Sequence, residues 1–317
     1  MARTARAGTW RVHDRSISLP VTITDARAAV AVFRASPDAA RGVLAGTGLT
    51  PWTVAGQAVG VLGVVRYGPW VLGRYDEVAV GVAVRGPGGR RGLHLVDLPV
   101  TGSFTRDAGR AIWSLPKWLM TAEVHLTDDA TSVVVETAPA APRHPLPPAR
   151  RDATDTAASD TQASDTQASD TQASDTQASG YAVGRGGGGA GGGAEFVLRA
   201  RLGAGRVRVP FPVRVRIPLW SVLPDGPRAG VLLRGAMPVR LRGVRLGRGR
   251  ARVELGSHPM AGRMAALGMT RRPLLTVTAT GLRGQLGLFT AAVRGGCTGG
   301  GTDGAAPGAD PEGGGQE

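Results

Sequence analysis

The chain has few of the residues that several classes of protein depend on. It contains one cysteine, Cys297, among 317 residues, so no intrachain disulfide can form and a metal site of clustered cysteines is excluded. No apolar run approaches the ~18 residues of a membrane-spanning helix, and the basic N-terminal segment lacks the apolar core of a signal peptide. We therefore expect a cytoplasmic protein that does not associate with membranes.

Aromatic and acidic residues are scarce beside arginine. The formal net charge is +14 and aromatic residues make up 4% of the chain, a balance that raises the question of nucleic-acid binding. The arginines are spread over nearly every segment, however, and no nucleic-acid-binding motif accompanies them. A compositional bias explains diffuse arginine better, so we expect no nucleic-acid partner.

Metal and phosphate-binding motifs are missing as well. His94, His125 and His258 are isolated and lack the spacing of metal ligands. None of the glycine-rich stretches lies between a convincing strand and a helix, as a phosphate-binding loop would. We expect neither a cofactor nor a metal.

The near absence of lysine is the most informative feature of the composition, because Lys117 is the only lysine in the chain. Arginine is effectively always protonated, whereas a lysine amine can lose its proton and attack a carbonyl carbon. A coding bias against lysine could leave one by chance, so the count alone does not assign a role. The residues around Lys117 have to supply the rest.

The segment before Lys117 is typical of a short helix. Thr105 is a candidate N-cap, Asp107 lies in the first turn, and the helix should end before Pro116. Lys117 would then follow the helix in an extended segment that carries it inward among apolar side chains. Such burial favours the neutral amine that nucleophilic attack requires.

Gly109, Arg110, Trp113, Pro116 and Lys117 form the pattern Gly-Arg-x-x-aromatic-x-x-Pro-Lys. This pattern resembles the signature of the acetoacetate decarboxylase family, in which the lysine after the proline forms a Schiff base with a β-keto acid. The resemblance extends over roughly residues 20 to 137 and 205 to 285.

Two further segments are similar to those of the family. Arg34 ends an early strand and precedes a short helix over 37–44, for which Ser36 is the expected N-cap. The stretch from Gly73 to Glu77 is similar to a Gly-x-Tyr-x-Glu segment that brings a glutamate to the active site. Taken from the residues alone, Glu77 is better explained as a solvated turn residue, and Arg34 could equally be part of a surface ion pair.

The resemblance implies an α+β fold, mostly antiparallel β, built as a cone-shaped β-barrel with a few short helices. It implies Lys117 as the Schiff-base nucleophile, Glu77 as the acid or base that moves protons, and Arg34 as the group that holds Glu77 or the substrate carboxylate. The substrate pocket would contain Trp113, Leu115, Trp118 and Leu62.

Three positions depart from the family pattern. Trp118 stands where decarboxylases have a second lysine, Ala111 replaces a glutamate, and Leu62 falls near a second active-site carboxylate. The expected function is decarboxylation of a small or medium β-keto acid. A lysine-dependent aldolase or dehydratase acting on a related ketone remains an alternative, as does a non-catalytic binding protein. Relatives form homo-oligomers, which the resemblance makes an expectation for this chain.

Composition divides the chain into folded and unfolded parts. Residues 1–15 are expected to be a flexible arm, and 16–137 together with 196–290 one domain. Residues 138–195 contain proline-rich sequence, four tandem Ser-Asp-Thr-Gln-Ala repeats over 159–178 and a glycine run. Such sequence cannot bury enough apolar surface to offset its ordering entropy, so we expect a disordered insertion, with a disordered tail over 291–317.

Periodicity predicts strands over most of the remaining sequence. Apolar runs predict strands over 54–65, 70–75, 78–84 and 93–100, and hairpins over 122–136 and 239–255. A helix over 258–267, ended by Gly268, should precede a strand over 274–280. Arginines alternate with apolar residues over 206–209 and 213–217. This face could bind an anion or nucleic acid, but a solvated face or a subunit contact is the favoured interpretation.

Overall fold

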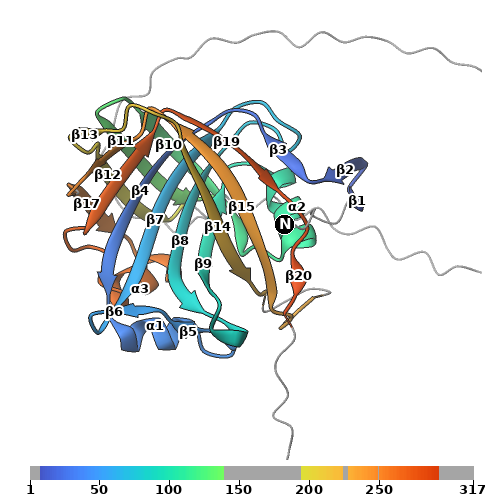
Figure 1. Ribbon diagram of the computed structural model, residues 1–317, viewed down its shortest axis with the longest axis horizontal. Coiled ribbons are helices and arrows are strands. Elements are labelled where there is room, and N and C mark those ends of the chain that lie inside the picture. Colours follow the sequence, from blue (N-terminus) through green and yellow to red (C-terminus); the bar gives the residue numbers. More distant parts are fainter. Residues whose placement is uncertain (1–7, 139–193, 224–227, 249, 293–317) are drawn as a thin grey trace, which may run out of the picture. The chain divides into compact units, whose positions relative to one another are not determined.

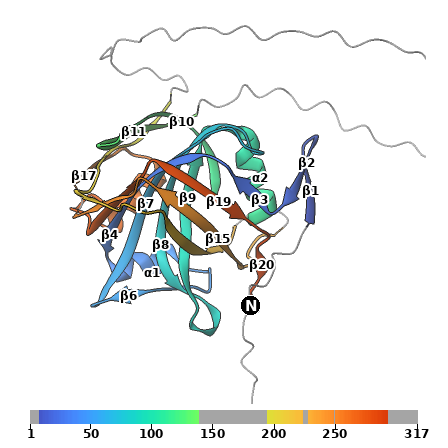
Figure 2. The same cartoon turned by 45° about the horizontal axis from the view of Figure 1, so that its top comes forward.

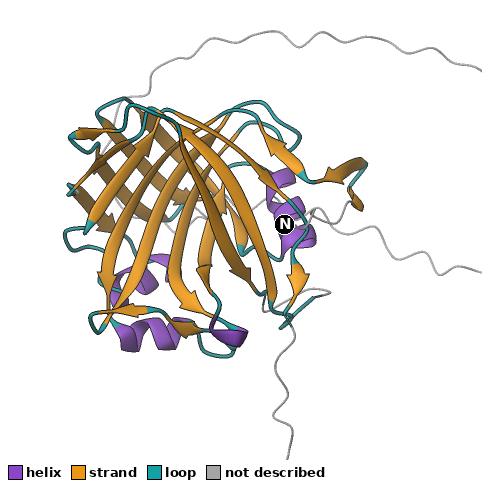
Figure 3. Cartoon of the chain, in the orientation of Figure 1, coloured by secondary structure: helices purple, strands orange, loops and turns teal. Residues whose placement is uncertain are grey.

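The structure, a computed structural model, describes residues 8–138, 194–223, 228–248 and 250–292. Apart from a few positions at their ends, the predicted disordered insertion and tail lie outside these ranges. Contacts group Met1–Ala138 with Glu195–Glu317 in one compact unit, which consists mainly of long strands with a few short helices (Figure 3).

The first elements form a hairpin and lead into the main sheet. Residues 8–12, which composition assigns to a flexible arm, instead form a strand that pairs antiparallel with its successor. The buried side chains of Val12, Ile17 and Leu19 explain this pairing, because they pack into an apolar core that also contains Tyr67 and Tyr75. The elements are β1 (Gly8–Val12), β2 (Arg15–Leu19), β3 (Val21–Ile23), β4 (Ala26–Ala35) and α1 (Pro37–Val43).

Helix α1 confirms the predicted capping. The Ser36 Oγ accepts a hydrogen bond from the Ala39 N–H, and Pro37 occupies the first turn. Beyond it the chain forms β5 (Thr50–Pro51), β6 (Thr53–Val54), β7 (Gln57–Tyr67), β8 (Tyr75–Arg85), the 3-10 turn η1 (Pro87–Gly89) and β9 (Arg91–Val100). The strand predicted over 70–75 is wrong: residues 70–74 turn between β7 and β8, with Gly73 at a φ of 88°, and only Tyr75 is in a strand, as the first residue of β8.

The central elements carry the lysine segment and span the predicted insertion. They are α2 (Ser103–Trp113), β10 (Lys117–Leu126), β11 (Ala130–Thr137) and β12 (Phe196–Gly203). Strands β10 and β11 form the predicted hairpin, and β11 pairs antiparallel with β12. Thr137 and Glu195 lie side by side, since the Thr137 N–H donates to the Glu195 carbonyl at 2.9 Å. Segments on both sides of the insertion therefore contribute to one sheet.

The C-terminal elements depart from one prediction. They are β13 (Val207–Arg208), β14 (Val213–Ser221), β15 (Leu233–Arg242), β16 (Arg245–Gly247), β17 (Ala251–Leu255), α3 (Pro259–Ala266), β18 (Leu275–Ala279), β19 (Gly281–Leu286) and β20 (Thr290–Ala291). The predicted hairpin over 239–255 does not form, because β16 pairs with β13 and β18 whereas β17 pairs with β12. Glycine-rich turns allowed a local hairpin, but the partners are distant in sequence.

The strands follow a branched path of ladders. One series runs β18, β4, β7, β8 and β9, and from β9 it continues into β14, β15, β19 and β3 or into β10, β11, β12 and β17. The strands curve strongly (Figures 1 and 2), yet no ladder among the described strands joins the ends of these branches. The predicted α+β, mostly antiparallel fold is confirmed, but the predicted closed barrel is not.

Two apolar cores lie on opposite faces of the strands β4, β7 and β8. The first core contains Phe33, Leu62, Val80 and the methionines of α3. The second core contains Tyr67, Tyr75 and residues of α2. Successive side chains of a strand alternate between these faces, which decides below which predicted site residues can meet. None of the helices in the described part combines the length and apolarity that a membrane crossing requires.

Candidate active site

Lys117 begins β10 immediately after helix α2. The helix ends at Ser114, which adopts a left-handed conformation with a φ of 52°, and the Leu115 N–H donates to the Gly109 carbonyl at 3.1 Å. This sharp end directs the chain back across α2, so the lysine side chain enters the core beside the helix. Lys117 is only 3% exposed.

The Lys117 amine meets two polar partners in this buried position. Its Nζ lies 2.9 Å from Oε2 of Glu77 and donates to Oγ1 of Thr105 at 3.0 Å. Sheet register brings the pair together: Glu77 lies opposite Val100 of β9, and Leu98 of the same strand lies beside Lys117. Both carboxylate and amine are withdrawn from solvent, with side-chain exposures of 10% and 4%.

Gly109 of the sequence pattern leaves room for the lysine side chain. A Cβ added at this position would lie 2.5 Å from Cδ and 2.8 Å from Cε of Lys117. The glycine of the Gly-Arg pattern is thus explained by packing, since any larger residue would collide with the aliphatic part of Lys117.

We expect Gly109→Ala to displace Lys117 from Glu77 and to destabilise the fold by about 1–3 kcal/mol through overpacking. Chemical denaturation measures the stability. Gly262→Ala is the matched control, because Gly262 lies in helix α3 with no atom within 4 Å of an added Cβ. There alanine should stabilise by roughly 0.5–1 kcal/mol through helix propensity alone. Equal effects of the two substitutions would contradict the close approach.

Two tyrosines complete the surroundings of the pair. The Tyr67 hydroxyl donates to Oε1 of Glu77 at 3.2 Å, and the Lys117 Nζ lies 5.0 Å from the centroid of the Tyr75 ring. The two phenol rings are stacked at 4.5 Å. Burial, followed by the nearby Glu77 charge, raises the pKa of both Tyr67 and Tyr75 well above the usual value. Both phenols therefore remain neutral, and Tyr67 remains a hydrogen-bond donor to Glu77.

The roles of Tyr67 and Thr105 are not apparent from the sequence. Thr105 was the expected N-cap, but the helix begins at Ser103 with Gly102 as N-cap. The shift of two residues places Thr105 in the first turn, buried and directed toward Lys117. Tyr67 ends β7 directly opposite Tyr75, a pairing that only the register reveals.

A hollow of about 610 Å³ lies against Lys117. Its lining is mixed rather than apolar: it includes Lys117, Trp118, Arg110, His94, Asp97, Arg263, Leu95, Val96, Val222 and Leu223. Arg110 of the sequence pattern also donates to the Lys117 carbonyl at 3.3 Å. The hollow thus combines apolar walls with several charged groups.

Other polar groups of the hollow are already engaged. Asp97 accepts two hydrogen bonds from the Arg263 guanidinium, at 2.9 and 2.6 Å. His94 lies 3.2 Å from the Trp220 carbonyl through Nδ1, and burial lowers the pKa of His94. His94 is therefore neutral and donates to that carbonyl.

Only one of the predicted pocket residues lines this hollow. Trp113 is buried in the second core and donates from its indole nitrogen to the Gly287 carbonyl at 2.8 Å, and Leu115 packs in the same core. Leu62 lies in the other core. It is three residues from Val65, the partner of Glu77, and residues three apart in a strand face opposite sides.

Trp118 lines the hollow but does not replace a second lysine beside the amine. It follows Lys117 in β10, so its side chain leaves the opposite face of the strand. There its ring lies 4.7 Å from that of His258 and packs against the first core. The substitution of tryptophan for lysine at this position therefore leaves the surroundings of Nζ to Glu77, Thr105 and Tyr75.

The structure does not bring Arg34 to the pair. Arg34 is exposed and pairs with Val59 of β7. Glu77 instead pairs with Val65 of β7, which pairs with Ala28 of β4. Arg34 is six residues along β4 from Ala28, a distance of about 20 Å at the rise of a strand. The expected contact of Arg34 with Glu77 is wrong, because the end of β4 lies beyond the site.

A buried amine, in contact with a carboxylate and set in a mostly antiparallel α+β fold, is the kind of site that can combine nucleophilic attack with proton transfer. Residues 11–140 match the family model described as acetoacetate decarboxylase (ADC). This match confirms the resemblance to the acetoacetate decarboxylase family and covers Lys117, Glu77 and the segments that position them. A search of curated proteins finds no match to the chain.

Solved structures share the fold at low sequence identity. Acetoacetate decarboxylase from Legionella pneumophila is 12% identical with a TM-score of 0.55, covering 86% of this chain and 87% of that one. A second acetoacetate decarboxylase structure is 13% identical with a TM-score of 0.52, covering 86% and 89%. The enduracididine biosynthesis enzyme MppR, complexed with the condensation product of pyruvate and imidazole 4-carboxaldehyde, is 12% identical with a TM-score of 0.50, covering 84% and 86%. These likenesses establish the fold.

Proposed function

We propose that this chain is a Schiff-base-forming carboxy-lyase that decarboxylates a small β-keto acid. The observation that carries the proposal is the buried contact of 2.9 Å between the Lys117 amine and the Glu77 carboxylate. The match of residues 11–140 to the acetoacetate decarboxylase family supports it. A cytoplasmic location and a homo-oligomeric state remain predictions.

In the first step, Glu77 takes a proton from the Lys117 ammonium, and the neutral amine attacks the ketone carbon of the substrate. The carbinolamine then loses water, with Glu77 returning the proton to the leaving hydroxyl, and an iminium ion remains. Thr105 accepts a hydrogen bond from Nζ, and Tyr67 holds the carboxylate by donating to Oε1. The Tyr75 ring, 5.0 Å from Nζ, stabilises positive charge on this nitrogen.

In the second step, the electrons of the bond to the carboxylate move toward the iminium nitrogen, and carbon dioxide leaves. The resulting enamine accepts a proton at carbon and is hydrolysed, which releases the ketone and restores Lys117. The hollow beside Lys117 would hold the substrate, with its carboxylate near the Arg110 guanidinium. Arg110 would then take the role that the family resemblance implied for Arg34.

A lysine-dependent aldolase or dehydratase is the second candidate. The position expected to provide another carboxylate is Leu62, and this residue faces the opposite core. Glu77 alone would then move the protons, which condensation chemistry on a ketone also permits. The MppR complex contains such a condensation product. A non-catalytic binding protein would retain the same fold and use the Lys117–Glu77 pair only as a structural ion pair.

Borohydride trapping tests the proposal directly. Incubation with acetoacetate and borohydride should increase the intact mass by one reduced adduct, and peptide mass analysis should locate it at Lys117. Carbon dioxide release distinguishes decarboxylation from condensation, which would give an adduct and a coupled product without gas. The chain without keto acid, treated with borohydride, is the control. The absence of an adduct with a series of β-keto acids and pyruvate would leave only the binding protein.

A further inference from the structure

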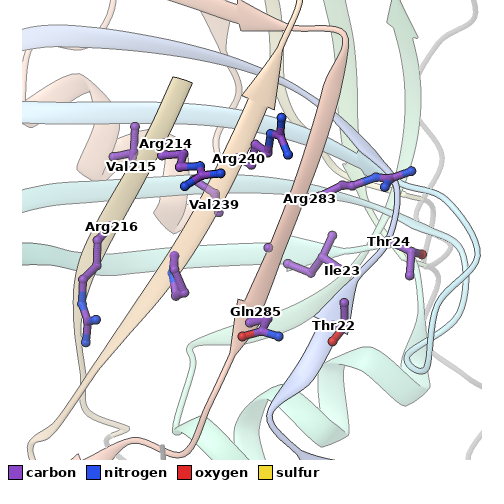
Figure 4. Close-up of a pocket in the computed structure, with 12 residues that line it drawn as sticks. Thr22, Ile23, Thr24, Arg214, Val215, Arg216, Val239, Arg240, Arg283 and Gln285 are labelled. Carbon is purple, nitrogen blue, oxygen red and sulfur yellow. The ribbon is translucent and has the colours of Figure 1, made fainter. Parts of the chain in front are cut away.

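Three arginines lie side by side on neighbouring strands, away from the candidate active site. Arg214 of β14 is directly opposite Arg240 of β15, and Arg240 is directly opposite Arg283 of β19. Residues paired in this way project from the same face of a sheet. Figure 4 shows the three side chains in a row across the sheet.

This row is not neutralised within the described part of the chain. None of Arg214, Arg216, Arg240 and Arg283 forms an ion pair among the described residues. The strands β3, β14, β15 and β19 contain no aspartate or glutamate. Like charges directly opposite one another destabilise a sheet. The cost of this arrangement suggests a bound partner of opposite charge.

The positive charge extends beyond the row. Arg216 lies two residues along β14 from Arg214 and faces Pro238. Burial, and then the nearby charges of Arg90 and Arg216, lower the pKa of Arg234 on β15. Several guanidinium groups therefore act on the same surface.

A groove of about 660 Å³ lies along these strands. Besides the four arginines, the groove is lined on the same face by Pro238 and by the polar side chains of Thr22, Thr24 and Gln285, whereas Ile23 and Val239 point into the core and are only 2% and 5% exposed. It shares no lining residue with the hollow beside Lys117. The groove therefore offers several hydrogen-bond donors beside the exposed Pro238 ring.

We propose that this groove binds an organic anion that carries two or more linked phosphate groups. Guanidinium groups form bidentate hydrogen bonds with phosphate. Strands lie ~4.8 Å apart, so the three arginines present a row of charge on the order of 10 Å long, which suits a chain of phosphates better than one. The exposed Pro238 ring would contact the organic part. This site would bind a second molecule, independent of the keto acid.

Inorganic pyrophosphate is the probe for calorimetric titration of the full-length protein at low ionic strength. We expect saturable one-to-one binding, weakened at least about tenfold by Arg240→Gln, because Arg240 is the centre of the row. Arg85→Gln is the matched control: Arg85 is exposed at the end of β8, outside the groove, and its loss changes the net charge equally. It should leave affinity within about twofold, as expected of a distant site.

Titrations with two other anions test whether the groove prefers linked phosphate groups. Sodium sulfate at matched ionic strength should not reproduce the pyrophosphate signal, and citrate should bind more weakly than pyrophosphate. Stronger citrate binding would overturn the assignment to phosphate, and equal loss in Arg240→Gln and Arg85→Gln would overturn the groove. Arg283→Gln provides a second variant. Circular dichroism should show all variants folded, because removing a charge from the row relieves repulsion.

Discussion

Replacement of Lys117 by arginine is expected to abolish turnover and the borohydride adduct together. Arginine retains the positive charge and can still pair with Glu77, but it remains protonated and cannot form an imine. We expect carbon dioxide release from the β-keto acid to fall by at least about 10³-fold, because the covalent route is lost. Intact mass after borohydride treatment should equal that of the untreated variant.

A second variant tests whether the adduct requires Lys117 itself or forms on any lysine that lines the hollow. Arg110→Lys introduces a second lysine in the lining of the same hollow, in a protein that still contains Lys117. Its adduct should remain at Lys117, because the Lys117 amine lies 2.9 Å from the Glu77 carboxylate and 3.0 Å from the Thr105 hydroxyl. Retained turnover in Lys117→Arg would refute the proposed mechanism.

Removing Glu77 alone should destabilise the protein strongly. Glu77→Leu leaves the Lys117 amine buried without its carboxylate, and breaking a buried pair in this way costs about 3–5 kcal/mol. The double variant Lys117→Met with Glu77→Leu replaces both charges by apolar groups of similar size, and should recover most of the loss or exceed the wild-type stability. Urea unfolding of the wild type, both single variants and the double variant measures the coupling.

The same four proteins separate folding from chemistry. The double variant should be stable and inactive if the pair serves catalysis. A Glu77→Leu protein as stable as the wild type would show that the contact contributes little, and would weaken the case for a buried ion pair. Loss of stability in the double variant, as large as in Glu77→Leu, would show that packing rather than charge explains the effect.

The local features of the site could be predicted where they depend on neighbouring residues. Pro116 and the apolar segment around it indicated that Lys117 follows a helix and turns inward, and the structure agrees. The helix at Ser36 and Pro37 was predicted for the same reason, because a cap and a first-turn proline act over a few residues. Glu77 was included through its resemblance to a family segment rather than through any local signal.

The remaining features depend on which strands pair and in what register. Leu62 and Glu77 lie close in the pairing of β7 and β8, but the alternation of the strand places them on opposite faces. Tyr67 reaches Glu77 because its strand ends opposite Tyr75. Arg34 is excluded by the length of β4. A sequence indicates faces within a strand, whereas contacts between strands require a register that local patterns do not determine.

The contact between Thr137 and Glu195 has a consequence for how this protein can vary. Two hydrogen bonds, at 2.9 and 2.8 Å, join these residues where β11 ends and β12 begins, so the ends of the intervening sequence meet wherever the rest of it lies. The free-energy penalty for closing a loop grows only with the logarithm of its length. Evolution can therefore lengthen, shorten or rewrite the repeats at this junction while the strands on either side keep the same partners.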